Sequence, residues 1–231
     1  MTGAAPLFAV SDAWRASCPG AAAGVLVARN LVNPAHHPAL EHWIAECEGT
    51  LRARFAGSDR AALRALPPLQ AYAAYYKRYG KTYHVQLQLE SVALKGKPIT
   101  RGSALLSAMV TTELTHLLLT AGHDLGALQP PVTLTVASGQ ERYRLLGGRE
   151  QAAQAGDMMM ADAGGVVSSV LYGPDERTQL RPETREVLFA VYVPPGIEER
   201  AVVEHLGDLA TAIRLFAPDA DVEAPRVYVA G

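Results

Sequence analysis

Cysteine and tryptophan are scarce in this chain of 231 residues, which has two of each. Cys18 and Cys47 match no metal-ligand spacing, and we expect both to be reduced, small hydrophobic side chains rather than a disulfide. Long hydrophobic runs are also missing, because none approaches the ~20 residues that a helix needs to cross a bilayer. The first residues lack the basic flank and the length of a secretory leader. We therefore expect a cytoplasmic protein that is not associated with a membrane.

A large excess of charge of one sign is missing too, since the formal net charge is −2 at pH 7. This balance argues against a protein that coats nucleic acids non-specifically, because such binding depends on neutralising phosphates. We expect no DNA partner, whereas brief local contact with RNA stays open. Hydrophobic residues make up 49% of the chain, which is enough for a folded protein with a sizeable core.

Common catalytic and cofactor motifs are absent as well. No glycine-rich dinucleotide loop follows a strand, no phosphate-binding lysine loop occurs, and no Gly-x-Ser-x-Gly elbow is found. We interpret Gly147-Gly148 and Gly164-Gly165 as turns between strands. His36-His37 precedes a proline and lacks an acidic or cysteine ligand set. The sequence therefore predicts neither a metal nor a cofactor.

Apolar patterning predicts an α+β fold, with a largely antiparallel sheet and flanking helices. We expect strands at residues 24–28, 83–91, 132–138, 142–147, 165–173 and 187–193, with a hairpin between the third and fourth. We expect helices from Pro38 to Phe55, from the Ser58-Asp59 cap to Pro67, over the following tyrosine-rich segment, from Ser103 to Gly122, and from Glu198 to Phe216.

The helix predicted from Ser103 to Gly122 leads directly into a polar pair. Ser103 can cap its start, and Gly122 can take the left-handed conformation that ends it. His123 and Asp124 then lie at a rigid helix terminus, where they can face a cleft and orient water or a substrate hydroxyl. The structural alternative is that Asp124 caps the next turn while His123 satisfies a buried carbonyl.

Two further segments carry polar groups in apolar surroundings. Ser168-Ser169 lies within an apolar strand, as either a hydrogen-bonded structural pair or a polar spot in a pocket. Met158 to Met160 is expected to fill the core.

Four tyrosines and several cations alternate before residue 82. Lys77, Arg78 and Lys81 interleave with the tyrosines, which are Tyr72, Tyr75, Tyr76 and Tyr79. One interpretation is a packed tyrosine stripe with solvated charges. The other is a basic, aromatic surface that binds RNA through these three cations.

Five segments stand in a recognisable order: GHDLGAL, VTLTVASGQERYRLLGGREQ, AGDMMMADAGG, VVSSVLYGPDERTQL and TREVLFAVY. Together they resemble the B3/B4 domain of the phenylalanyl-tRNA synthetase β subunit, and more closely the free-standing proteins built from that domain alone. The resemblance covers residues 77 to 193. It implies a B3/B4-type domain over residues 67–231, with residues 1–66 as a helical N-terminal addition packed on it.

The resemblance implies a pocket for a misattached amino acid, because the synthetase domain hydrolyses tyrosine wrongly esterified to its tRNA. We therefore expect this chain to bind aminoacyl-tRNA or its amino-acid moiety, and to deacylate misacylated tRNA in trans. The alternatives are a non-catalytic module that binds tRNA, other RNA or an amino acid, and a small-molecule enzyme on the same fold. We expect the cavity between the exit of the central helix and the far end of the serine-bearing strand.

The resemblance also assigns residues to this pocket. His123 stands at the position of the pocket histidine, as the catalytic group that positions water. The resemblance adds Ser169, Tyr172, Gly173 and Ala190 as expected substrate-binding residues. The polar pairs described above add Asp124 and Ser168. Ala190 replaces a glutamate that receives the tyrosine hydroxyl in the synthetase, so the amino acid bound here is expected to have a side chain other than that of tyrosine. Backbone N–H groups near Tyr172-Gly173 are expected to hold the developing oxyanion.

Overall fold

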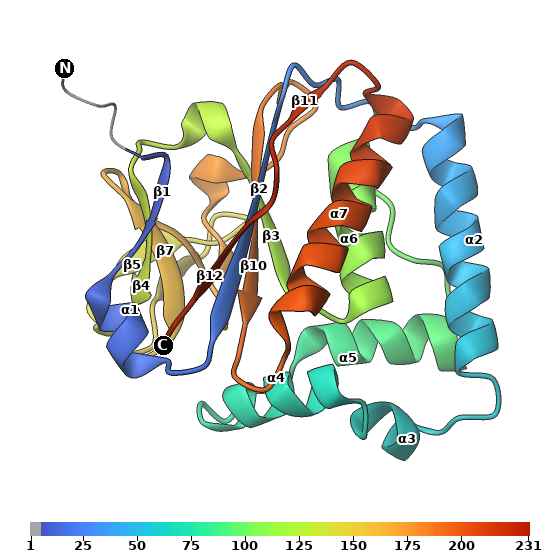
Figure 1. Cartoon of the computed structure of the whole chain (residues 1–231), viewed down its shortest axis with the longest axis horizontal. Coiled ribbons are helices and arrows are strands. Elements are labelled where there is room, and N and C mark those ends of the chain that lie inside the picture. Colours follow the sequence, from blue (N-terminus) through green and yellow to red (C-terminus); the bar gives the residue numbers. More distant parts are fainter. Residues whose placement is uncertain (1–5) are drawn as a thin grey trace.

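Three layers lie one behind the other in the structure, a computed structural model that describes residues 6–231 (Figure 1). The middle layer is a five-stranded sheet with the order β11–β2–β10–β3, in which β12 also pairs with β2. Its strands are β2 (Ala22–Arg29), β3 (Thr120–Asp124), β10 (Val187–Val193), β11 (Asp221–Val222) and β12 (Arg226–Val229). Every side chain of β10 is buried, as expected for a central strand covered on both faces.

A second five-stranded sheet packs on one face of the first. Its order is β1–β4–β7–β8–β9, and all its pairs except β1–β4 are antiparallel. The strands are β1 (Phe8–Val10), β4 (Val132–Val136), β7 (Met158–Asp162), β8 (Gly165–Ser169) and β9 (Gly173–Pro174). A separate ribbon joins β5 (Arg142–Arg144) to β6 (Glu150–Ala152). The predicted α+β class, with largely antiparallel strands and flanking helices, is confirmed.

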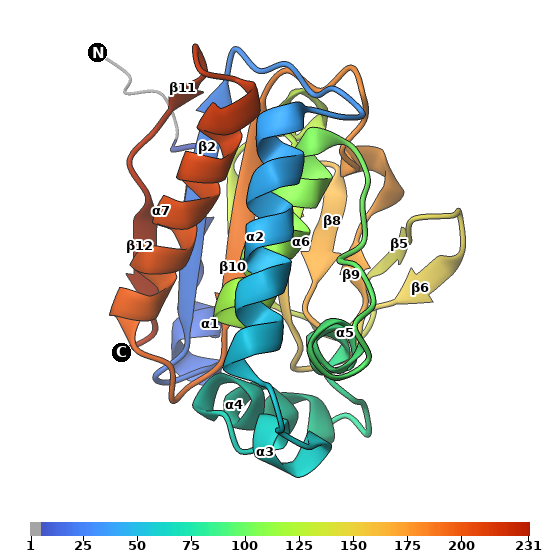
Figure 2. The same cartoon turned by 90° about the vertical axis from the view of Figure 1, so that its right-hand side faces the viewer.

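Helices cover the other face of the first sheet. Figure 2 shows α2 (Pro38–Arg54), α6 (Ala104–His116) and α7 (Glu199–Phe216) side by side over β2 and β10. The shorter helices are α1 (Asp12–Ser17), α3 (Arg60–Arg64), α4 (Pro67–Lys77) and α5 (His84–Leu89), which continues as a π-helical segment (Glu90–Leu94). Among residues 6–231, no helix has the length and apolar character needed to cross a membrane.

The strand predicted over residues 83–91 is wrong, because this segment is helical. Val85 and Leu89 are buried at a four-residue spacing, whereas Leu87 between them is 45% exposed. The Gln86 amide donates to the Glu90 carboxylate over 2.8 Å, which is a contact between adjacent helical turns. Tertiary packing and this polar pair outweigh the alternating pattern.

The prediction that the central helix ends at Gly122 is also wrong. The helix stops at Leu117, which has a left-handed φ of 63°, and residues 120–124 form β3 instead. Gly122 is needed inside this strand for space, since a Cβ would lie 2.9 Å from Leu180 Cδ1 and 2.9 Å from Phe189 Cε1. Ser103 occupies the N-cap position, but its hydroxyl makes no cap hydrogen bond. His123 and Asp124 therefore lie at the end of a strand, not of a helix.

The hairpin predicted between residues 132–138 and 142–147 does not form. β4 pairs with β1 and β7, while β5 pairs with β6. The Glu141 carboxylate instead accepts hydrogen bonds from the N–H groups of Ser138 and Gly139, at 2.9 and 3.0 Å, and this redirects the chain. The glycine turns are confirmed, with positive φ at Gly147, Gly148 and Gly165.

Residues 6–66 are not a purely helical addition, because they supply β1 to the second sheet and β2 to the first. β2 pairs with β10 along seven residues. A division at residue 66 therefore does not match the strand pairing. Residues 1–5 of the predicted addition lie outside the described residues. Both cysteines are free, and Cys18 is buried.

Candidate functional site

A cavity of about 570 Å³ lies beside the junction between α6 and β3 and beside the end of β8. Its walls come from four parts of the chain that are far apart in the sequence. They are His84 and Gln88 of α5, Leu106, Met109, Val110 and Glu113 of α6, residues 119–122 at β3, and residues 169–174 after β8, with Leu146, Gln179, Leu180 and Tyr192 completing the wall. This is the position that the sequence predicted for the pocket.

The turn after β8 is held by a buried hydrogen-bond network. The Ser169 hydroxyl accepts from the Tyr172 N–H and from the Tyr143 hydroxyl, each over 3.2 Å. The Tyr143 hydroxyl also contacts the Gly173 carbonyl at 3.1 Å, and Gly173 has a left-handed φ of 86°. Ser169, Tyr172 and Gly173 thus line the cavity as predicted. The Tyr172 N–H already has a partner, so it is not free to hold an oxyanion in this state.

Glu113 is a buried carboxyl group on the cavity wall. It is 4% exposed, and its Oε2 accepts a hydrogen bond of 2.8 Å from the Thr120 N–H. Burial raises the pKa of Glu113 to about 8, opposed by that hydrogen bond, so the group carries its proton at neutral pH. Sequence reasoning missed this residue. The available signal was a single acid on the apolar helix, at the same spacing as Leu106 and Met109.

His123 is fully buried between the two sheets and does not line the cavity. Its Nδ1 lies 2.9 Å from the Thr178 hydroxyl, and its Nε2 lies 3.2 Å from the Ser168 hydroxyl. Burial, with a smaller contribution from Arg177, lowers the pKa of His123 to about 3. The imidazole therefore stays neutral at physiological pH and has no direct access to a water molecule in the cavity.

Ser168 connects this buried histidine to the cavity wall. Its hydroxyl bonds both to His123 and to the hydroxyl of Tyr192, which lines the cavity. Ser168 itself is fully buried and is not a wall residue. Of the two neighbouring serines, one is thus structural and the other faces the cavity.

Asp124 and Ala190, predicted in the pocket, lie outside its wall. The Asp124 carboxylate accepts from the Gly126 N–H over 3.0 Å and from the Thr184 hydroxyl over 2.7 Å, which confirms its capping role. Ala190 is paired with Ala121 in the β10–β3 ladder and is 2% exposed. The predicted site therefore divides into residues that face the cavity and residues that brace the sheets.

The tyrosines before residue 82 are packed against the rest of the protein, in agreement with the interpretation of this segment as a packed tyrosine stripe. The hydroxyl of Tyr75 donates to Asp157 over 2.6 Å, and the hydroxyl of Tyr76 donates to the Val170 carbonyl over 2.7 Å. The cations beside them remain exposed. The Arg78 guanidinium lies 4.5 Å from the Tyr75 ring centroid, a favourable cation–π distance.

Lys81 brings this basic segment to the edge of the cavity. Its Nζ lies 4.7 Å from the ring centroid of Tyr172, which is a wall residue. A second hollow of about 500 Å³ beside it is lined by Arg64, Lys77 and Lys81, together with neutral side chains. Positive charge is therefore concentrated next to the cavity although the whole chain is slightly acidic.

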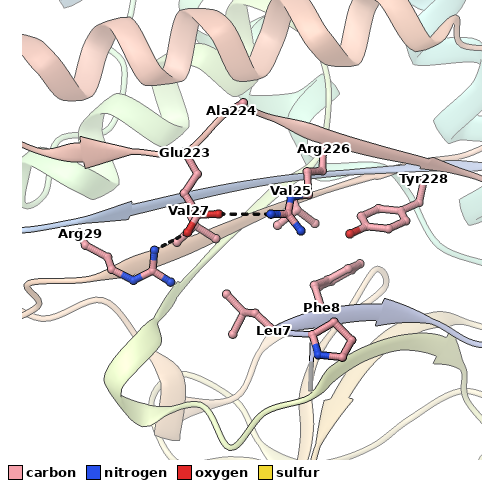
Figure 3. Close-up of a pocket in the computed structure, with 10 residues that line it drawn as sticks. Leu7, Phe8, Val25, Val27, Arg29, Glu223, Ala224, Arg226 and Tyr228 are labelled. Carbon is pink, nitrogen blue, oxygen red and sulfur yellow. Dashed lines mark hydrogen bonds and ion pairs between the residues drawn. The ribbon is translucent and has the colours of Figure 1, made fainter. Parts of the chain in front are cut away.

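Another pocket of about 260 Å³ lies between β1 and the strands β2 and β12 (Figure 3). Its charged side chains are already paired, since Glu223 forms ion pairs with Arg29 and with Arg226 (Figure 3). The Phe8 and Tyr228 rings lie 5.2 Å apart across it. This pocket is smaller, and its polar groups satisfy one another. Among residues 6–231, no cluster of three or more His, Cys, Asp or Glu side chains has metal-binding geometry.

Comparisons with known proteins leave the family unassigned. No known family and no curated protein matches the sequence. The structure is similar to an N-terminal fragment of the phenylalanyl-tRNA synthetase β subunit from Pyrococcus horikoshii, with 13% identity and a TM-score of 0.47. The similarity covers 93% of this chain and 49% of that one, so the chain spans about half the length of the fragment. Similarity of this size carries no functional argument.

Proposed function

We propose that this protein binds the aminoacyl end of a tRNA in the cavity beside α6 and hydrolyses the ester bond of misacylated tRNA. The observation that carries the proposal is the position of the cavity, between the α6–β3 junction and the turn after β8, where the B3/B4 resemblance predicts an amino-acid pocket. Its volume of about 570 Å³ lies within the range of small-molecule sites.

The composition of the wall suits an amino acid. Apolar side chains from α6 and β3 line much of the space, and the polar side chains on the wall include those of Glu113, Ser169 and Tyr192. Such an arrangement binds an apolar side chain and orients a polar group attached to it.

Ester hydrolysis at the 3′ end of a tRNA needs an ordered water molecule and a held carbonyl, not a protein nucleophile. His123 acts in this proposal as a positioning residue, because it contacts the wall only through Ser168 and Tyr192. It holds the Tyr192 hydroxyl in place, and Tyr192 faces the ligand.

The basic side chains provide the expected contact with RNA. Lys77, Arg78 and Lys81 are exposed, and Lys81 lies beside the cavity residue Tyr172. An acceptor end whose amino acid enters the cavity would pass its phosphates over this segment. Phosphate contacts of this kind weaken as the salt concentration rises.

A non-catalytic binding module is the second candidate. The enclosure of His123 and the occupied Tyr172 N–H favour it, because neither predicted catalytic group is free to act on a ligand in the cavity. The two candidates share the same cavity and differ only in whether the ester is cleaved.

A panel of labelled misacylated tRNAs tests both candidates. We expect loss of the label from at least one tRNA that carries an apolar amino acid, together with salt-sensitive binding of uncharged tRNA. Leu106→Trp, which fills the cavity, should abolish the reaction. Val203→Trp, at an exposed position of α7, is the matched control and should retain it. Binding without hydrolysis would favour the second candidate, and neither binding nor hydrolysis would reject both.

A further inference from the structure

We infer that Glu113 recognises the free α-amino group of the bound amino acid, so that the cavity selects amino acids whose amine is unacylated. This inference rests on the proposed function, since it names the chemical class that the same cavity accepts. It concerns a residue that the sequence did not single out.

The bonding capacity of the Glu113 carboxyl is incompletely used. The group is almost fully buried, lines the cavity, and receives one hydrogen bond, from the Thr120 N–H to Oε2. Within residues 6–231 the carboxyl forms no ion pair and no further hydrogen bond. A carboxylate has about four acceptor positions, so a ligand donor in the cavity would find a ready acceptor.

No positive group of the described chain neutralises Glu113 from the surrounding elements. The helix α4 and the segment after it contribute Tyr72, Tyr76 and Tyr83, whose pKa values burial raises well above the usual range. Behind β3, the His205 ring bonds the Thr120 hydroxyl, and burial lowers its pKa to about 3. His84 of α5 also lines the cavity, and burial lowers its pKa. An ammonium group in the cavity would therefore supply a counter-charge for the ionised form of this carboxyl.

Binding of an ammonium group requires the carboxyl to lose its proton. Burial keeps the pKa of Glu113 near 8 in the empty cavity, so the protonated form dominates at pH 7. When R–NH₃⁺ enters, the carboxyl gives its proton to solvent and the pair becomes carboxylate and ammonium, with one positive charge bound and one proton released. An opposite charge within a few ångströms favours the ionised carboxyl.

The apolar part of the cavity wall determines which amino-acid side chain the cavity accepts. Leu106, Met109 and Val110 of α6 face the space from one side, and Leu119, Leu171 and Leu180 from other sides. The cavity thus fits an aliphatic or thioether side chain attached to a free amine. An N-acylated amino acid offers Glu113 only an amide and would leave the ion pair unformed.

Binding of amino acid amides tests this recognition without requiring tRNA or ester cleavage. L-leucinamide and L-methioninamide are titrated against their N-acetyl derivatives by calorimetry, in two buffers that differ in ionisation enthalpy. We expect the wild-type protein to prefer the free amine by at least about tenfold and to release about one proton at pH 7. Glu113→Gln should remove both effects. Glu150→Gln, on the exposed strand β6, is the matched control and should keep both.

In the calorimetry, two results would overturn the inference: no preference for the free amine in the wild-type protein, or a preference that Glu113→Gln retains. A parallel assay with aminoacyl-tRNA and N-acetylaminoacyl-tRNA separates the proposals. Equal hydrolysis of the two tRNAs rejects amine recognition while leaving the proposed function intact. If the protein binds the amides in an amine-dependent way but neither binds nor hydrolyses the aminoacyl-tRNAs, the role of Glu113 is supported and the proposed function is rejected.

Discussion

His123 and Glu113 lie in adjacent regions of the interior and differ in what surrounds them. His123 is enclosed between the sheets, with both ring nitrogens bonded to hydroxyl groups. Glu113 faces an open cavity with one hydrogen bond. Burial lowers the pKa of His123 to about 3 and raises that of Glu113 to about 8, so both are neutral at pH 7. The comparison shows that burial shifts the pKa of both groups, but that only Glu113 has unused hydrogen-bonding capacity on the cavity wall.

The largest expected effect is on stability, from His123→Ala. The substitution leaves a void and removes one hydrogen-bond partner from each of the hydroxyls of Thr178 and Ser168, which we expect to lower the free energy of unfolding by about 3 kcal/mol. Glu113→Gln should change it by less than about 1 kcal/mol near pH 4, where the carboxyl is neutral in both the folded and the unfolded protein and is replaced by an amide of the same size. Urea denaturation of both variants measures the contrast. A larger loss in Glu113→Gln than in His123→Ala would reverse the roles assigned to the two regions.

The pH dependence of stability should have opposite signs in the two regions. The folded-state pKa of Glu113 lies above its usual 4.5, so the folded protein holds this proton more tightly and the free energy of unfolding falls as pH rises from 4.5 to 8. The folded-state pKa of His123 lies below its usual 6.5, so its contribution is lost as pH falls from 6.5 to 3. Each group contributes a slope of up to about 1.4 kcal/mol per pH unit.

Denaturation of the wild-type protein and Glu113→Gln across pH 5 to 8 isolates the first slope. The difference in unfolding free energy between the two should change steadily over this interval, with the variant gaining relative stability as pH rises. Parallel curves would show that Glu113 titrates near its usual value and that the cavity is wetter than described.

A smaller effect is expected from Gly122→Ala, in the wall between the two regions. The new Cβ would lie 2.9 Å from Leu180 Cδ1 and from Phe189 Cε1, which should cost about 1–2 kcal/mol through overpacking. Gly49→Ala is the control, since its Cβ would meet nothing within 4 Å on helix α2, and it should stabilise the protein slightly. Thermal unfolding of both variants checks the prediction, and an unchanged melting temperature in Gly122→Ala would mean that this wall is loosely packed.

The smallest effect is expected from Lys81→Ala, at the exposed edge of the cavity. Removing one cation should weaken tRNA binding by a few-fold and reduce its dependence on salt by about one phosphate contact. Filter binding over a range of salt concentrations measures both quantities. Lys95→Ala, in an exposed position outside the cavity wall, is the comparison, and equal losses in the two variants would indicate non-specific attraction.

The sequence predicts correctly those helices and strands whose apolar residues form an unbroken run or a regular helical stripe. β2, β10, α2 and α7 were found because long apolar runs or helical stripes leave little choice of structure. The alternating pattern at residues 83–91 predicts a strand, but the segment is helical. The Gln86–Glu90 hydrogen bond and the packing of Val85, which favour the helix, are not visible in a period-two pattern. The glycine at position 122 was interpreted as a helix stop, although its role is to leave room for Leu180 and Phe189.

The sequence predicts where the cavity lies but not all of the residues on its wall. The sequence predicts the cavity and its wall residues Ser169, Tyr172 and Gly173, but it assigns to His123 the position facing the cavity that Glu113 occupies. A histidine beside a glycine attracts attention in a sequence, and a lone acid within a helix does not. Whether His123 faces the cavity or the second sheet depends on the register of β3 against β10, which sequence patterning does not determine.

The most direct test of the account is a crystal structure of the protein with a non-hydrolysable aminoacyl analogue, 3′-deoxy-3′-(L-leucyl)amino-adenosine. The account predicts that the leucyl group lies in the cavity against α6, that its amino nitrogen is within hydrogen-bond distance of Glu113, and that the adenosine extends toward Tyr172 and Lys81. A leucyl group bound elsewhere, or one whose amine points away from Glu113, would contradict it.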